Sequence, residues 1–295
     1  MGGPPHASAV PAHRELRADR EPAYGGPGGV DGSIDWLCLP HFDSPSVFAA
    51  LLDDQKVGRF RIAPAGDHLR RKQFYWPDTA ILVTRFLHEE GVGEFEDYMP
   101  VGGSGAVPDE LIRRVRVVRG QLRFHLECRP AFDYARATPE CHLAANGARF
   151  DGPGLSLGLA APLPLRRDGA GVVADFTRRE GEKATFVLRR LAPESSPGAC
   201  PGVGAAEDLF RDTVAYWRRW LSRCTCTGRW REMVHRSALT LKLLSFEPTG
   251  AIACSPRSRA RRAGSTSSSP TPGSQSTPPW ARSPRSSMTR SSTST

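Results

Sequence analysis

One serine in this sequence lies between two glycines, at a spacing found around catalytic serine nucleophiles. The pentapeptide GLSLG at residues 154–158 matches G-x-S-x-G, a pattern in which a sharp strand-to-helix turn exposes a serine nucleophile for acyl transfer. That turn must lead into a helix, but AAPLP follows at residues 160–164. We therefore predict that Ser156 lies on a strand and is not a nucleophile.

Cofactor and metal chemistry have equally little support. The glycines at residues 25–32 have no predicted strand before them and no lysine after them, so they do not form a phosphate-binding loop. The seven cysteines are scattered and include no C-x-x-C pair, which argues against a zinc site and against a disulfide framework. We predict no cofactor and no metal.

The basic charge of the chain is confined to its last residues. The formal net charge is +9, yet residues 248–295 hold seven arginines and no acid, which leaves 33 basic against 31 acidic side chains in residues 1–247. The arginine run at 257–262 has no interleaved aromatic residues, so we expect from it only salt-sensitive, non-specific contacts. No specific nucleic-acid partner is predicted.

Targeting signals do not stand out in the sequence. Residues 1–20 contain no apolar signal region, and no run approaches the length of a membrane span. We expect a cytoplasmic protein with no membrane partner. The oligomeric state stays open.

The densest apolar stretch, DGSIDWLCLPHFDSPSVFAALL, covers residues 31–52. Alternating residue types predict a strand from Ser33 to Leu39, which Pro40 ends. Ser44 suits a helix N-cap and Pro45 the first helical position, so a short helix is expected to follow as far as Leu52. A polar corner at residues 41–43 separates the two elements.

The middle of the chain has the pattern of an antiparallel β-sandwich. Short apolar/polar alternations recur about every ten residues, with turn residues between them and no intervening helix pattern. Glycine and a polar residue separate several of them, as in Gly120-Gln121 and Asn146-Gly147. The expected strands are Thr79–His88, Glu94–Val101, Ile112–Arg119, Leu122–Arg129, His142–Ala145, Ala148–Phe150, Leu155–Ala160, Val172–Thr177 and Ala184–Leu191.

The periodicity becomes helical after Pro201. The first predicted helix begins near the acids Glu207 and Asp208 and continues to Leu221. A second helix is expected from about Arg229 to Phe246, with Pro248 and Gly250 ending it. Its apolar stripe comprises Trp230, Met233, Val234, Ala238, Leu241 and Leu244.

Both ends of the chain are expected to be disordered. Residues 1–30 are rich in Pro, Gly and Ala, and residues 255–295 contain no Val, Ile, Leu, Phe or Tyr. The second segment is either a natural low-complexity tail or an out-of-frame translation of GC-rich DNA. Shifted codons of such DNA are biased towards Arg, Ser, Pro, Thr and Ala, and we favour the frameshift as a hypothesis because the sequence pattern described next breaks off abruptly after Ile252.

Several segments together resemble the amino-terminal domain of bacterial trehalase and glucoamylase-like proteins of glycoside hydrolase family 15. They are residues 31–52, 58–64, 81–86, 96–100, 128–134, 216–217 and 230–252. The resemblance implies a β-sandwich over residues 31–200, followed over residues 201–252 by a linker helix and the first helix of an incomplete (α/α)6 barrel. It stops after Ile252, and residues 253–295 would be the non-matching tail.

The resemblance also implies a chemistry. Inverting glycoside hydrolysis needs two carboxyl groups about 6.5–9.5 Å apart, one as acid and one as base. In the family both are barrel glutamates beyond the point of divergence, and Glu247 is better explained as a helix-end residue. We therefore expect an α-glucosidic substrate, with trehalose ahead of maltooligosaccharides, and no activity from this chain alone. A carbohydrate-binding or structural module and a basic-tail interaction protein remain as alternatives.

Within the matching part, Trp36, His41 and Asp43 are the best candidates for contacting a sugar. Sugar recognition uses an aromatic plane beside hydrogen-bonding groups, and these residues combine the two. The competing interpretation is that Trp36 belongs to the core and that Asp43 caps the turn before the predicted helix. No catalytic residue is predicted.

Overall fold

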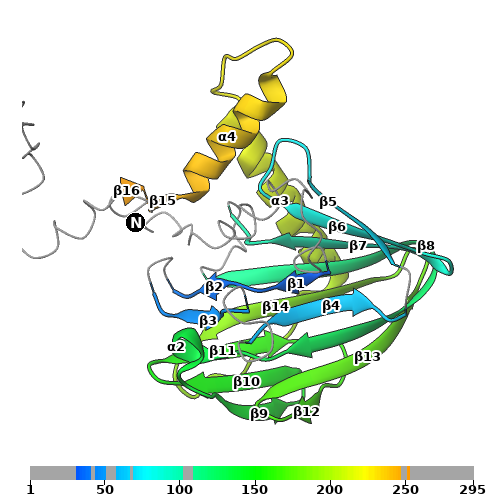
Figure 1. Cartoon of the computed structure of the whole chain (residues 1–295), viewed down its shortest axis with the longest axis vertical. Helices are drawn as coiled ribbons and strands as arrows, with labels where there is room; N and C mark the ends of the chain where they lie inside the picture. The colour runs from blue at the N-terminus through cyan, green and yellow to red at the C-terminus, as the bar shows by residue number, and fades with distance from the viewer. Residues whose placement is uncertain are drawn as a thin grey trace, which may run out of the picture. The chain divides into compact units, whose positions relative to one another are not determined.

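The computed structural model describes residues 31–40, 44–50, 58–66, 69–101, 109–246 and 251–252. It is mostly β, as the sequence predicts (Figure 1). The predictions of disorder for residues 1–30 and 253–295 lie outside the described residues. So do His41, Asp43, Glu247, Pro248 and Gly250.

One long strand, β8 (Glu110–Cys128), belongs to two antiparallel sheets. Its first half lies in a large sheet and its second half in a small sheet, between different neighbours. The large sheet has the order β5 (Arg70–Tyr75), β6 (Leu82–His88), β7 (Gly91–Tyr98), β8, β14 (Lys183–Leu191), β11 (Leu155–Ala160), β10 (Gly147–Gly152), β9 (Glu140–Ala144). The small sheet has the order β1 (Ser33–Ile34), β4 (Phe60–Pro64), β8, β13 (Gly171–Arg179), β12 (Arg166–Asp168).

The expectation of two separate strands around Gly120-Gln121 is therefore wrong. Gly120 has φ +74° and lies inside the continuous strand, where β8 passes from one sheet to the other. A Cβ at this position would lie 2.1 Å from the carbonyl oxygen of Glu90, so only glycine fits. The glycine allows a local change of direction instead of a reversal of the chain.

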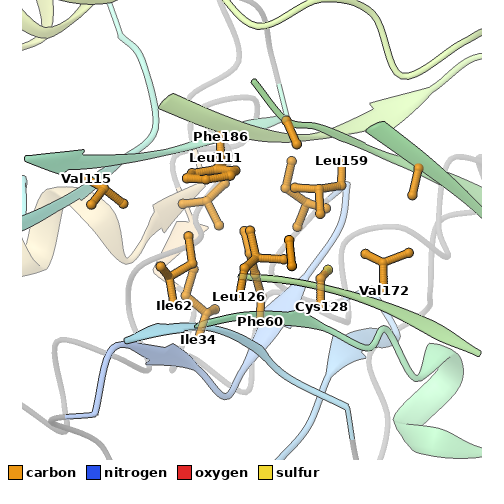
Figure 2. Packing of buried hydrophobic residues seen from close by; sticks show 14 of the residues in the cluster. Ile34, Phe60, Ile62, Leu111, Val115, Leu126, Cys128, Leu159, Val172 and Phe186 are labelled. Atoms are coloured by element: carbon orange, nitrogen blue, oxygen red, sulfur yellow. The ribbon is translucent and has the colours of Figure 1, made fainter. Parts of the chain in front are cut away.

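Apolar side chains from the two sheets meet in a single core, as Figure 2 shows. Leu111, Val115, Leu159 and Phe186 of the large sheet face Ile34, Phe60, Ile62, Leu126, Cys128 and Val172 of the small sheet. A row of phenylalanine rings crosses this core at centroid spacings of 5.0, 5.7, 5.2 and 5.5 Å; its members are Phe86, Phe95, Phe124, Phe176 and Phe186. The predicted antiparallel sandwich is confirmed.

The predicted helix after Pro45 is wrong. Residues Ser46–Phe48 form β3, which pairs antiparallel with β2 (Leu37–Cys38). The predicted strand over residues 33–39 is also interrupted, because Asp35 and Trp36 separate β1 from β2. A short amphipathic pattern specifies a helix weakly, and the pairing with β2 buries Val47 and Phe48 completely.

The helix α3 (Val203–Leu221) covers the outer face of the large sheet. Its Phe210 ring meets Trp76 and Tyr98 edge to face, at centroid distances of 5.4 and 5.7 Å. The helix begins before the predicted start at Glu207, so that acid does not stabilise the first turn. Glu207 instead pairs with Lys183 and Arg114 on the sheet, at 2.8 and 2.9 Å.

The helix α4 (Arg231–Leu243) is shorter than expected, because Ser245–Phe246 forms β15 and pairs with β16 (Ala251–Ile252). Its predicted apolar stripe is not buried as a whole. Met233, Leu241 and Trp230 keep 62%, 56% and 56% exposure, while His235 and Leu239 are the buried residues. In the described part of the chain, no helix is both long and apolar enough to span a bilayer.

Candidate functional site

The candidate sugar-contact residue Trp36 lies in the break between β1 and β2 and is half-buried. Its ring lies 6.1 Å from the ring of Tyr134, centroid to centroid, at an interplanar angle of 47°. Trp36 therefore belongs to an aromatic pair at the edge of the sandwich and not to its closed core. His41 and Asp43 lie outside the described residues, so their part in the site stays a prediction.

Tyr134 lies in an unusual backbone segment, α2 (Phe132–Ala135). Three successive residues without a glycine, Asp133, Tyr134 and Ala135, have φ of 51°, 57° and 64°. This left-handed conformation costs roughly 1–2 kcal/mol per residue for L-amino acids. Such strain persists only where the surroundings over-determine it, and it clusters at functional sites.

The surroundings of α2 supply that constraint from both sides. Phe132 is 3% exposed, and its ring packs so closely on Gly152 that a Cβ there would lie 2.7 Å from it. The amide of Ala131 donates to the carbonyl of Val47 on β3 at 2.9 Å. The amide of Ala137 closes the turn on the carbonyl of Phe132 at 3.1 Å. The turn is thus fixed to the core, with Tyr134 at its apex.

Charged groups surround the exposed side of Tyr134. The tyrosine is 37% exposed, and the guanidinium of Arg136 lies 5.5 Å from its ring centroid. Arg136 is also 3.6 Å from the carboxylate of Asp133. The ring therefore has the Arg136 guanidinium over it, with the Asp133 carboxylate paired to that arginine.

A polar groove of about 640 Å³ borders the same turn, with Ala131 and Ala135 in its wall. Two arginines and two acids line it in an ion-paired row. Glu127 lies 3.3 Å from Arg59 and 2.9 Å from Arg129, which also pairs with Asp168. The formal charges of these four groups cancel, so the groove offers hydrogen-bond donors and acceptors without a net charge.

A second charged cluster lies under α3, on the outer face of the large sheet. Glu94 is 2% exposed and pairs with Arg85 and Arg116. Burial raises the pKa of Glu94, but the hydrogen bonds from Arg116 and Arg85 outweigh it and hold the pKa below its ordinary value. Because every charge in this cluster is paired, its role is to hold strands and helix together.

Ser156 lies on β11, as the sequence predicts. Its hydroxyl donates to Asp151 at 2.5 Å and accepts from Arg149 at 3.0 Å. His142 lies 3.8 Å from the other oxygen of Asp151, so a carboxylate separates the serine from the imidazole. A nucleophile needs the imidazole next to the hydroxyl, and this order prevents it.

Tyr134 was not among the candidate residues predicted from the sequence. The segment CRPAFDYAR at residues 128–136 contains the aromatic residue and the flanking charges, but nothing in it indicates a left-handed turn, because glycine is absent. The pairing of Tyr134 with Trp36 joins residues far apart in the sequence. The only available signal was an aromatic residue between two charged ones.

Comparison with known proteins gives a consistent set of relatives. The family model described as trehalase-like, N-terminal, matches residues 22–175. The chain is 33% identical over 230 residues to a trehalase of Thermoplasma acidophilum. This match covers 77% of this chain and 39% of that protein. A trehalase of Thermoplasma volcanium is 30% identical over 241 residues, a match that covers 77% of this chain and 36% of that protein. A trehalase of Mycolicibacterium smegmatis is 30% identical over 250 residues, a match that covers 76% of this chain and 37% of that protein. The chain spans about two fifths of the length of these curated relatives.

Proposed function

This chain belongs to the trehalase-like N-terminal family, and from that premise we propose that it is the amino-terminal part of a glycoside hydrolase that cleaves α-glucosidic bonds. Trehalose is the leading substrate and maltooligosaccharides are the alternative. The observation that carries this proposal is the family match over residues 22–175, together with relatives that are trehalases. The role belongs to carbohydrate metabolism.

The division of labour within such a hydrolase follows from the arrangement of the elements. We assign residues 31–200 to the sandwich domain and residues 201–252 to the start of a helical catalytic domain. The exposed Met233 and Leu241 on α4, with the exposed Trp230 just before it, support this division, because an apolar helix face of that size is suited to packing against further helices.

This chain alone is proposed to turn over nothing. Hydrolysis with inversion requires an acid and a base held on opposite sides of the glycosidic bond. The carboxylates in the described core are engaged in structural pairs, as Asp97 is with Arg113 and Glu94 is with Arg116. Neither has the free, cleft-facing position that general acid–base catalysis needs.

The test is an incubation of the purified chain with trehalose and, separately, with maltooligosaccharides, followed by enzymatic detection of glucose. The trehalase of Mycolicibacterium smegmatis provides the positive control and a heat-killed sample the background. We expect no glucose above background from this chain. Reproducible release of glucose that scales with the amount of chain would overturn the proposal of inactivity.

A further inference from the structure

We propose that Trp36 and Tyr134 form a sugar-binding ledge that holds one pyranose ring of a neutral α-glucoside. The inference deepens the proposed function and rests on it for the class of ligand. The site itself is drawn from the described residues alone, and it comprises the Trp36–Tyr134 pair, the charged pair Asp133 and Arg136, and the neighbouring groove.

The first step is the placement of Tyr134. A tyrosine that served only to fill the core would be buried, as Phe132 is two positions earlier. Tyr134 is instead 37% exposed at the apex of a turn whose backbone is left-handed over three residues. The turn is fixed by Phe132 and by the Ala131 to Val47 hydrogen bond, so the ring is held outward before any ligand arrives.

The second step is the geometry of the aromatic pair. Trp36 and Tyr134 form a tilted aromatic pair, with ring centroids 6.1 Å apart and an interplanar angle of 47°. The C–H face of a pyranose is apolar and packs against aromatic planes, while its equatorial hydroxyls need hydrogen-bond partners at the edge. Arg136 lies over the Tyr134 ring and pairs with Asp133, so a donor and an acceptor for such hydroxyls are present at this ring.

The third step concerns charge. Asp133 balances Arg136 at the ledge, and in the groove Glu127 and Asp168 balance Arg59 and Arg129. A site for a phosphorylated sugar would show an excess of arginine or lysine. The balanced charges favour a neutral sugar, so the ledge should bind trehalose or maltose and gain nothing from a phosphate group.

The experiment is saturation-transfer NMR and calorimetry on the full chain, with trehalose and maltose as probes and glucose 6-phosphate as the charged comparison. We expect saturable binding of the neutral disaccharides. Replacing Tyr134 by alanine should weaken their affinity about three- to tenfold, the range expected for the loss of one aromatic contact. Y134F keeps the ring and should stay within about twofold of the unmodified chain.

W230A is the matched control, because Trp230 is also an exposed aromatic residue with an arginine over its ring, but lies next to α4. It should leave sugar affinity unchanged. Far-ultraviolet circular dichroism and thermal melts verify that each variant is folded. Equal affinities for Y134A and the unmodified chain would refute the ledge, and so would a W230A loss as large as that of Y134A. An unmodified chain that binds neither disaccharide also refutes it, whereas the proposal that this chain does not hydrolyse α-glucosides is judged separately by the glucose-release assay.

Discussion

Arg113 is fully buried and ties the two sheets together. From β8 it donates to Asp97 at 2.8 and 3.2 Å, and it also donates to the carbonyl oxygens of Phe60 and Gly32 at 2.8 and 2.7 Å. Its guanidinium further lies 4.8 Å from the ring centroid of Phe60. The small sheet therefore depends on a charge supplied by the large one.

We predict that R113A destabilises the chain by about 3–5 kcal/mol, because the substitution leaves the Asp97 carboxylate buried without its cation. Urea denaturation measures the loss. The control is R123A on the same strand, where the exposed Arg123 lies 3.9 Å from Asp175 and a change below about 1 kcal/mol is expected. Equal losses for the two variants would contradict the assigned role of Arg113.

Glu94 should make stability depend on pH. Its pKa in the folded chain lies below the ordinary value, so its ionised form stabilises the fold above about pH 4.5. This contribution is lost as the pH falls through the lowered pKa. The difference in unfolding free energy between the unmodified chain and E94Q should be largest near neutral pH and shrink below pH of about 4.5. Denaturation curves at several pH values test this, with E89Q in the exposed β6–β7 turn as control. A difference in unfolding free energy between the unmodified chain and E94Q that grows on acidification would contradict it.

At the scale of elements, the passage of β8 between the sheets depends on one glycine. Gly120 and Gly154 have nearly the same backbone, with φ of +74° and +73°, but a Cβ at Gly154 would meet nothing within 4 Å. We predict that G120A destabilises the chain by clearly more than G154A, whose cost should be about 1 kcal/mol from backbone conformation alone. Comparing the melting temperatures of the two variants tests this, and equal shifts would show that the close approach to Glu90 has no cost.

The attachment of α4 to the sandwich depends on Asp78 in the β5–β6 connection. Asp78 lies 2.8 Å from the ring nitrogen Nδ1 of His235, and the neighbouring Thr79 carbonyl accepts from Arg236 at 2.7 Å. D78A should therefore speed hydrogen exchange of the amides in α4 while leaving β8 protected. D208A, which breaks an exposed pair within α3, is the control. Unchanged exchange in α4 of D78A would contradict this attachment.

The sequence predicted well those strands that pair with a neighbour close in the sequence, and those elements whose apolar and polar residues alternate without interruption. β10 and β11 follow directly from alternating residues around turns, and α3 follows from helical spacing. Ser46–Phe48 was predicted as helix because its pairing with β2 is a tertiary property. Gly120 was predicted to lie in a turn between two strands, because a glycine in a turn and a glycine with positive φ inside a strand look the same in the sequence.

At the scale of the whole molecule, the family was predictable from the sequence, whereas the Trp36–Tyr134 pair was not. Trp36 was named as a candidate, and its sugar contact stays a prediction. Its partner Tyr134 comes from a segment almost a hundred residues away, and only the folded chain brings the two together. In the predicted apolar stripe of α4, Met233 and Leu241 remain exposed, whereas Ala238 packs partly against Leu239 and its neighbours.

We propose that this chain is a non-catalytic part of an α-glucoside hydrolase. The most direct test is a one-dimensional NMR time course of trehalose in the presence of the purified chain, following the anomeric proton signals. We expect a trehalose signal of constant area with no glucose signals, even after prolonged incubation. Growth of the anomeric signals of free glucose, absent from a heat-killed sample, would contradict it.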